Sequence, residues 1–315
     1  MYKDKVIAVL IPAFNEEKLI KRTIESVPNF VDKIVVTNDA STDKTRQIVE
    51  EVMKNNSKLL LINHESNQGV GGSIATMYKW ARDKDVDVAV VMAGDSQMDP
   101  SDMPDLLNAV IDDGVDLAKG NRLLNSGIKK SMPSLRYYAS QFLSLFTKIA
   151  SGYWHIMDSQ SGYTAINKKA LHLIDWNKLY RRYGQPNDLL VQLNVENMKV
   201  RDIPIKPIYN IGEKSGIKMY KLFFTLSWLL FRRFIRRLKE KYIVRDFHPL
   251  VFFYFLGGVF GVSTVALSIR VIYIWATLGY VPSINALAAF FSFMSASLFI
   301  LFAMWFDMSA NQHLK

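Results

Sequence analysis

The sequence contains no cysteine among its 315 residues. It therefore offers no disulfide bond, no thiolate nucleophile and no zinc site with cysteine ligands. Its five histidines show no spacing typical of a metal site or a catalytic triad. Residues 1–17 contain only a short apolar run that ends in carboxylates, without the cleavage pattern of a signal peptide. We therefore expect the first domain to stay in the cytoplasm.

Charge is missing from two long segments near the C-terminus. Residues 249–269 and 271–306 contain no Asp, Glu, Lys or Arg, and only Arg270 separates them. A helix of about 20 apolar residues is long enough to cross a hydrocarbon core of about 30 Å. The two segments therefore predict a transmembrane hairpin, which makes the chain an integral membrane protein. The apolar faces of such a hairpin could also pair in a homo-oligomer.

Positive charge is concentrated just before the hairpin. Residues 206–245 hold 11 Lys or Arg against 2 Asp or Glu, and thus most of the net charge of +10. Apolar and aromatic residues lie beside Arg232, Arg233, Arg236 and Arg237, which is the pattern of an interfacial amphipathic helix. A basic block next to apolar spans indicates contact with anionic lipid headgroups on the cytosolic side. Nucleic-acid binding is not expected, because no nucleic-acid-binding motif accompanies the block.

The first 117 residues alternate short β-branched runs with amphipathic stretches. The runs at 6–11, 33–38, 58–63 and 86–92 predict buried parallel strands, and the stretches at 16–27, 43–55, 69–83 and 101–113 predict helices. This alternation indicates an α/β fold with a Rossmann-like, doubly wound sheet. Further along the chain, helices are expected near 134–151 and 184–198, and a strand at 200–209.

Polar residues collect after three of the predicted strands, where such sheets bind ligands. They are Pro12, Phe14, Asn15 and Glu16, then Asn38 and Asp39, and finally Asp95, Gln97 and Asp99. Asp95 and Gln97 are two residues apart, so an extended loop would point both side chains the same way. Magnesium and manganese prefer oxygen ligands and are commonly held by one or two carboxylates plus substrate phosphates. A turn or a helix cap is the alternative for so short a motif.

Four segments resemble, in chain order, the loops of family 2 glycosyltransferases of the GT-A type. They are IPAFNEE, VVTNDASTDKT, NQGVGGSIATMYKWA and AGDSQMDP. Within that family the sequence looks most like polyprenyl-phosphate glycosyltransferases, the group that contains dolichyl-phosphate mannose synthase. The resemblance covers about residues 5–215 and implies a GT-A catalytic domain that binds a nucleotide sugar.

The resemblance also implies roles for individual residues on the donor side. Residues that would bind the nucleotide sugar are Pro12, Phe14, Glu16, Thr37, Asp39, Gly94, Asp95 and Lys214. Asp95 and Gln97 would hold a divalent cation, magnesium or manganese, on the diphosphate.

On the acceptor side, the segment KGNRL resembles the G-S-R element of the family, which implies that Arg122 binds phosphate. Arg136 and Ser140 are four residues apart and share a helical face. By resemblance they would hold the acceptor phosphate together with Arg122; a solvated arginine and a packing serine are the alternative. DSQSGYTAI resembles the D-x-T-S-G-F element, which places Asp158 beside the acceptor. The implied catalytic residues are thus Asp95, Arg122 and Arg136.

The sequence departs from the family pattern at two places. Where relatives often carry D-x-D, this chain has Ala93, Gly94 and Asp95, so only the second carboxylate remains. Where relatives commonly show R-x-x-G-E-S-K, it reads YNIGEKSGIK, which leaves Lys214 and Lys218 as substitute cations over the diphosphate.

Together these features predict inverting, metal-dependent transfer of one sugar from a UDP- or GDP-linked donor to a polyprenyl or dolichyl phosphate at the cytosolic membrane face. A phosphate acceptor needs no general base, because its second pKa of about 6 leaves it anionic at neutral pH. One alternative is a transferase that extends a lipid-linked sugar or a polysaccharide with a base such as Asp158 or Asp188. The other is a catalytically weak membrane scaffold, suggested only by Ala93. The sequence specifies neither the sugar nor the nucleotide.

The expected organisation has four parts. They are a cytosolic GT-A catalytic domain at 1–219, basic amphipathic interfacial helices at 220–246, a transmembrane hairpin at 247–307 with spans at about 249–278 and 284–306, and a short cytosolic tail at 308–315.

Overall fold

The computed structural model describes residues 1–124, 134–206, 208 and 219–315, without the side chains of 134–140 and 219–222. They form two compact units, Met1–Phe234 with Leu314–Lys315, and Ile235–His313. The strands are β1 (Ile7–Ala13), β2 (Lys33–Asn38), β3 (Leu59–Asn63), β4 (Val88–Val91), β5 (Leu117–Asn121), β6 (Thr164–Asn167) and β7 (Val200–Pro204). The α-helices are α1 (Ile20–Glu25), α2 (Thr45–Met53), α3 (Val70–Asp83), α4 (Met103–Ile111), α6 (Ser134–Ser151), α7 (Lys168–Leu173), α8 (Gln185–Val195), α9 (Met219–Lys239), α10 (Leu250–Leu278) and α11 (Ser283–Ala310).

The first unit is built on one seven-stranded sheet in the order β3-β2-β1-β4-β6-β5-β7. The four strands predicted from the N-terminal part are confirmed and pair in parallel. β6 runs antiparallel to both β4 and β5, and β7 pairs in parallel with β5. The sheet is therefore mixed rather than entirely parallel. The sequence did not predict β5 and β6, because they are short and include the polar residues Lys119, Asn121 and Thr164.

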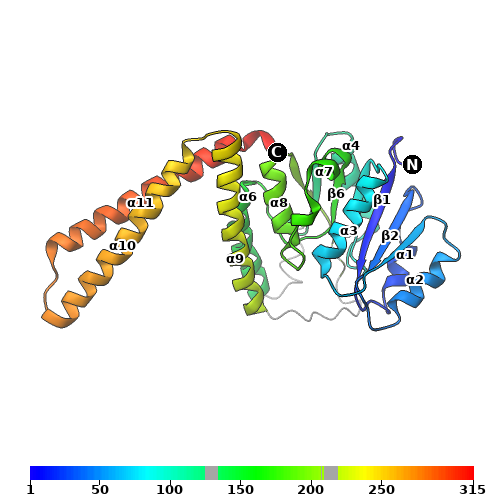
Figure 1. Ribbon diagram of the computed structural model, residues 1–315, viewed down its shortest axis with the longest axis horizontal. Coiled ribbons are helices and arrows are strands. Elements are labelled where there is room, and N and C mark those ends of the chain that lie inside the picture. Colours follow the sequence, from blue (N-terminus) through cyan, green and yellow to red (C-terminus); the bar gives the residue numbers. More distant parts are fainter. Residues whose placement is uncertain (125–133, 207, 209–218) are drawn as a thin grey trace. The chain divides into compact units, whose positions relative to one another are not determined.

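Helices cover both faces of this sheet, as Figure 1 shows. Side chains alternate along β1: Ala8 and Leu10 pack in the core that includes α3, α7 and α8, whereas Ile7 and Val9 pack in the core that includes α1, α2 and α4. Strands covered on both faces are apolar throughout, which is why their sequences read as unbroken β-branched runs. This layering brings the carboxyl ends of β1, β2 and β4, with their polar loops, to one edge.

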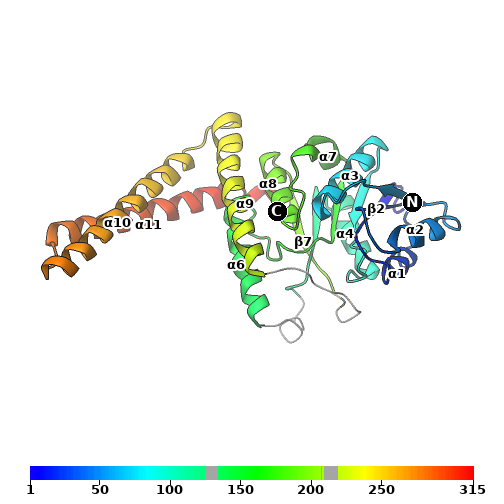
Figure 2. The same ribbon diagram turned by 60° about the horizontal axis from the view of Figure 1, so that its bottom comes forward.

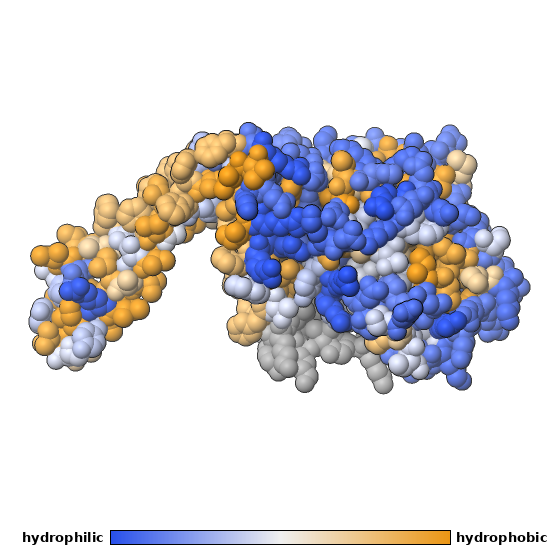
Figure 3. Space-filling model, viewed as in Figure 1, coloured by the Kyte–Doolittle hydropathy of each residue, from blue (hydrophilic) through white to orange (hydrophobic). Residues whose placement is uncertain are grey.

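The second unit contains the two predicted spans. α10 and α11 are both long and apolar enough to cross a bilayer, and most of their surface is not buried inside the protein. Phe253 packs against Phe306 with ring centroids 5.2 Å apart, and Phe260 stacks on Phe299 at 5.7 Å. On the face shown in Figure 3, hydrophobic residues make up most of the hairpin surface. Helices that are apolar all round are expected where lipid, not water, surrounds them.

The C-terminal residues differ from the predicted short tail at 308–315. Helix α11 continues to Ala310, beyond the predicted end of the span. Leu314 is 1% exposed and belongs to the core of the first unit. The side chain of Leu314 is therefore packed within the first unit.

The position of Arg237, within the second unit, shows that part of the interfacial prediction is wrong. It is completely buried, although the sequence placed it among the arginines that face lipid headgroups. Its two terminal nitrogens donate to the Asp307 carboxylate at 2.8 and 2.9 Å, and Tyr242 Oη and Asn311 Nδ2 donate to the same group. The prediction failed because this carboxylate lies 70 residues away along the chain.

In the first unit, α6, α8 and α9 lie side by side in both ribbon views (Figures 1 and 2). Leu143 of α6 packs with Leu226 and Leu229 of α9. The outer face of α9 leaves Phe224 and Trp228 71% and 62% exposed, which agrees with the amphipathic pattern.

Candidate active site

The loops after β1 and β2 are held together by hydrogen bonds. Asn15 adopts a left-handed φ of 57°, a conformation that asparagine tolerates better than most residues. Its N–H donates to Ser41 Oγ at 3.1 Å, and its Oδ1 accepts from the Thr42 N–H at 2.8 Å. The Glu16 N–H donates to Thr45 Oγ1 at 2.8 Å. The first loop, which carries predicted donor-binding residues, is therefore joined by hydrogen bonds to the loop after β2.

The loop after β4 lies against the loop after β1. A Cβ on Gly94 would come within 3.2 Å of the Pro12 carbonyl oxygen and 3.6 Å of Glu16 Cγ, so glycine permits this close approach. Asp95 Oδ1 accepts from the Gln97 N–H at 3.1 Å, which closes a tight turn. Both predicted metal ligands thus lie in one short turn beside Glu16.

This edge concentrates negative charge. Burial, together with the nearby carboxylates of Asp95 and Asp43, raises the pKa of Glu16 to about 7. Within the described ranges, no group of three or more His, Asp or Glu side chains could hold a metal by itself. Magnesium or manganese would therefore need Asp95, Gln97 and phosphate oxygens of the substrate, and this donor set fits such ions.

The other residues predicted to bind the nucleotide differ in accessibility. Phe14 is 47% exposed and Pro12 is partly exposed, so both can contact a ligand. Thr37 is completely buried, and its hydroxyl has no hydrogen-bond partner among the residues that the structure describes. Thr37 therefore presents no surface to a ligand here. Lys214 and Lys218 lie outside the described residues.

Asp39, which the resemblance assigned to donor binding, is bonded within the protein. Its Oδ1 accepts from the Gln68 N–H at 2.8 Å and its Oδ2 from the Gly69 N–H at 2.7 Å. His64 Nδ1 lies 2.7 Å from Oδ1. Sequence reasoning missed this contact, although His64 follows β3 as Asp39 follows β2, and parallel strands end at the same edge. Asp39 therefore organises the third loop, which joins β3 to α3.

Glycines at the end of this third loop and in the first turn of α3 make room for residues 180–182. A Cβ on Gly71 would lie 2.1 Å from the Tyr180 carbonyl oxygen. At Gly69, which has a φ of 82°, it would lie 2.5 Å from the Arg181 carbonyl oxygen. Any other residue at either position would collide with backbone, so these glycines are explained by close packing of two loops.

Arg122, directly after β5, forms a bidentate ion pair with Asp158. Its Nε and Nη2 donate to the two carboxylate oxygens at 2.7 and 3.0 Å, and its N–H donates at 3.2 Å. Although burial alone would raise it, the ion pair with Arg122 holds the pKa of Asp158 below its usual value. The Arg122 side chain remains 22% exposed. Arg136 and Ser140 lie on α6, but their side chains are outside the described part of the chain.

Lys119 is a residue of this region that sequence reasoning missed. It is 1% exposed in β5, and its Nζ donates to the carbonyl oxygens of Asp158 and Ser161, each at 2.6 Å. Burial lowers its pKa to about 8. Lys119 thus fixes the loop that presents Asp158 to Arg122. A lysine inside the otherwise apolar start of a strand was the available signal, because a buried ammonium group requires internal acceptors.

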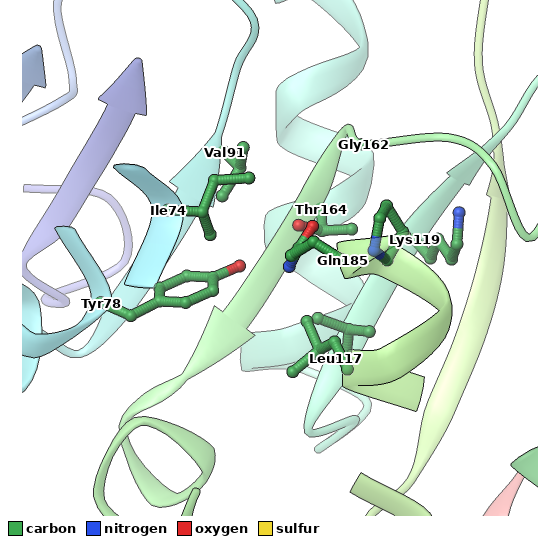
Figure 4. A pocket seen from close by; sticks show the side chains of 10 residues that line it. Ile74, Tyr78, Val91, Leu117, Lys119, Gly162, Thr164 and Gln185 are labelled. Carbon is green, nitrogen blue, oxygen red and sulfur yellow. The ribbon is translucent and has the colours of Figure 1, made fainter. Parts of the chain in front are cut away.

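A small cavity lies in the interior of the first unit (Figure 4). Its lining comes from α3, β4, β5, β6 and α8, and the side chains of Tyr78, Lys119 and Gln185 border it. Its volume of about 10 Å³ has room for about one water molecule. A nucleotide sugar is far too large for this cavity, which is therefore not a donor site.

Comparison with known proteins identifies the family of this chain. Residues 8–183 match the model of the family described as Glycosyl transferase family 2. Over 243 residues the chain is 31% identical to UDP-N-acetylglucosamine–dolichyl-phosphate N-acetylglucosaminyltransferase of Methanococcus voltae, covering 72% of this chain and 96% of that protein. Over 202 residues it is 25% identical to undecaprenyl-phosphate mannosyltransferase of Micrococcus luteus, covering 63% and 82%.

The fold is also similar to that of a solved structure. Glucosyl-3-phosphoglycerate synthase from Mycobacterium tuberculosis, in complex with Mn2+, UDP and glucosyl-3-phosphoglycerate, matches with a TM-score of 0.54. The match covers 74% of this chain and 80% of that chain at 17% identity, which supports a common fold. The predicted GT-A fold is thereby confirmed. By the family match and the relative that aligns over almost its full length, the chain belongs to glycosyl transferase family 2.

Proposed function

We propose that the protein transfers one sugar from a nucleotide sugar to a polyprenyl or dolichyl phosphate, with inversion at the anomeric carbon. Similar proteins named as transferases to dolichyl phosphate and undecaprenyl phosphate support this acceptor. One of these names specifies N-acetylglucosamine and the other mannose, so the proposal includes UDP- and GDP-linked donors of hexose or N-acetylhexosamine.

The observation that carries the proposal is the state of the two candidate bases. Asp158 is held by Arg122, which keeps its pKa low. Asp188 is completely buried and paired with Arg233. A carboxylate locked to an arginine is a poor proton acceptor, and an alcohol acceptor would need one. A phosphate acceptor does not, because it is already ionised at neutral pH.

In the proposed reaction, an oxygen of the acceptor phosphate attacks the anomeric carbon from the side opposite the leaving group. The bond between that carbon and the diphosphate oxygen breaks as the new bond forms, and the nucleoside diphosphate leaves with the electron pair. Arg122, with Arg136 and Ser140, would hold the acceptor phosphate in line for this displacement. The exposed part of the Arg122 side chain supports its role.

On the donor side, Phe14 and Pro12 would contact the base, and the turn of Asp95 and Gln97 would face the diphosphate. A magnesium or manganese ion held by this turn would neutralise the developing charge on the leaving diphosphate. The position of this turn beside Glu16 supports the assignment, because a cation there would also offset the charge of a second carboxylate.

The membrane hairpin would bring the catalytic domain to its lipid substrate. The basic residues that precede α10 favour an orientation with both ends of the hairpin in the cytoplasm. Arg232 and Arg236 keep exposed or partly exposed side chains on α9, so they can reach anionic headgroups. Arg236 is paired with the exposed Glu240 one helical turn away, whereas Arg233 and Arg237 are paired with completely buried aspartates and are not assigned to lipid.

The test is an assay of the purified full-length protein in detergent. We would incubate it with labelled UDP- and GDP-sugars, magnesium and a polyprenyl phosphate, and extract the lipid product. One donor should yield a lipid-phosphate sugar of inverted anomeric configuration, and Asp95→Ala should remove most of this activity. Absence of product with all common donors, or transfer only to an acceptor that already carries a sugar, would refute the proposal.

A further inference from the structure

The ion pair between α8 and α9 occupies a buried position in the first unit. Arg233 Nε lies 2.5 Å from Asp188 Oδ1, with the two side chains 19% and 0% exposed. Arg233 Nη2 donates to Asp188 Oδ2 and to the Lys178 carbonyl oxygen, each at 3.1 Å. A guanidinium group bound at several points has its orientation fixed, because its nitrogens lie in one rigid plane.

Helix α9 also packs closely on the residue that precedes α8. A Cβ on Gly184 would lie 2.5 Å from Leu229 Cδ2 and 2.9 Å from Leu226 Cδ2. Leu226 and Leu229 of α9 therefore pack directly on Gly184, so α9 contacts this part of the chain through both apolar packing and charge.

From Asp188 the contacts continue to the third loop. Asp188 Oδ2 accepts from the Tyr180 N–H at 2.6 Å. The neighbouring Arg181 carbonyl oxygen accepts from the Gly72 N–H at 3.1 Å. Arg182 Nη1 donates to Asn67 Oδ1 at 2.8 Å. Residues 180–182 are therefore held by Asp188 on one side and hold the third loop on the other.

The third loop in turn holds Asp39, at the edge where the donor is proposed to bind. Its two N–H donors, at Gln68 and Gly69, occupy both oxygens of the Asp39 carboxylate. Direct contacts thus run without a gap from Arg233 on α9 to Asp39. Such a series of contacts has a functional role when a substitution at one end alters ligand binding at the other end.

We propose that Asp188 and Arg233 are a positioning pair through which α9, the helix that leads into the membrane hairpin, sets the shape of the donor-binding edge. This assigns Asp188 to donor affinity and not to proton transfer. The inference rests on the proposed function in one respect, that the edge near Asp39 binds the nucleotide sugar.

The variants Asp188→Asn and Arg233→Lys test this pair. Asparagine keeps an oxygen for the Tyr180 N–H but removes the charge, and lysine keeps the charge but removes the planar contact. The Kd of UDP and GDP would be measured by calorimetry on the full-length protein with magnesium and without acceptor. For the nucleotide that binds, we expect each variant to raise the Kd about tenfold, which corresponds to ~1.4 kcal/mol.

Steady-state kinetics provide a second measurement, which would not change if the pair had only a structural role. Both variants should raise the KM for the donor, while kcat at saturating donor and acceptor stays within about threefold of the parent. Gly184→Ala provides a second perturbation of the same contact without touching a charge. The added methyl group should push against Leu229 and also weaken nucleotide binding.

Matched controls come from an exposed ion pair in the same unit. Arg201 Nη1 lies 2.6 Å from Asp113 Oδ2, and both side chains are substantially exposed. Asp113→Asn and Arg201→Lys make the same chemical changes there and should leave the nucleotide Kd unchanged. Thermal unfolding is measured for every variant, and a cooperative transition identifies the variants that are folded.

Two results would overturn the inference. An unchanged nucleotide Kd in folded Asp188→Asn, Arg233→Lys and Gly184→Ala proteins would show that the contacts only stabilise the fold. A large loss of kcat at unchanged Kd in Asp188→Asn would instead make Asp188 a participant in the chemistry. A parent protein that binds nucleotide but forms no lipid product would count against the proposed acceptor alone, so the two proposals can fail separately.

Discussion

Replacing Arg237 by leucine should strongly destabilise the C-terminal unit. The Arg237 and Asp307 side chains are both 0% exposed and share a bidentate ion pair. Removal of the arginine leaves a carboxylate buried without its cation. Breaking such a pair from one side typically costs about 3–5 kcal/mol. Asp307 keeps hydrogen bonds from Tyr242 and Asn311, so we expect a value near the lower end, about 3 kcal/mol.

The double variant Arg237→Leu with Asp307→Leu separates charge from packing. Replacing a whole buried ion pair by apolar side chains is often close to neutral, because both desolvation costs disappear. Tyr242 and Asn311 lose an acceptor in this variant, but Asn311 Nδ2 still donates to Tyr242 Oη at 2.7 Å. We therefore expect the double variant to be more stable than the single variant by about 2 kcal/mol.

The absence of cysteine provides the assay. A single cysteine in place of Ser292, which is 6% exposed in α11, becomes accessible to a thiol reagent only when the hairpin opens. The ratio of labelling rates in detergent between variant and parent gives the change in free energy of opening. A change of about 3 kcal/mol corresponds to about a hundredfold faster labelling.

A matched control is Arg232→Leu, at an exposed position of α9, which should change stability by less than about 0.5 kcal/mol. The reasoning would be refuted if Arg237→Leu labelled no faster than this control. It would equally be refuted if the double variant labelled as fast as the single variant, because an unpaired charge would then not be the cause.

Three further predictions concern the site. Asp95→Ala should remove the magnesium-dependent part of nucleotide binding in calorimetry; an equal magnesium effect in the variant would contradict the metal assignment. The folded-state pKa of Glu16, about 7, is above its ordinary value of 4.5, so ionisation of Glu16 destabilises the fold progressively as the pH rises from about 4.5 to 7. Glu16→Gln should therefore raise the Tm at pH 8 and have little effect near pH 4.5, and a shift independent of pH would argue against this cause. Asp158→Asn should raise the KM for the acceptor phosphate, because Arg122 loses its ionic partner, while a loss of kcat of about 10³ at unchanged KM would identify Asp158 as a base.

The sequence by itself determined the features that depend on neighbouring residues. Unbroken β-branched runs predicted β1 to β4, because strands covered on both faces must be apolar along their whole length. Long uncharged segments predicted α10 and α11 for the equivalent reason in lipid. The sequence also placed Asp95 and Gln97 together in the loop after β4, although it favoured an extended loop and gave the observed turn only as the alternative.

Only the tertiary structure decided which distant charges meet. The periodicity of α9 marks its apolar face, but it does not say that Arg237 has a carboxylate partner 70 residues away, or that Arg233 pairs with Asp188. Similarly, Lys119 supports the Asp158 loop through backbone oxygens that no sequence motif specifies. A local pattern fixes the face on which a side chain lies, whereas its partner depends on how strands and helices far apart in the chain are packed. For this protein the sequence therefore determined the loop that holds Asp95 and Gln97 and the two long apolar helices, whereas the packing of α8, α9 and β5 decided which charged groups pair within the protein.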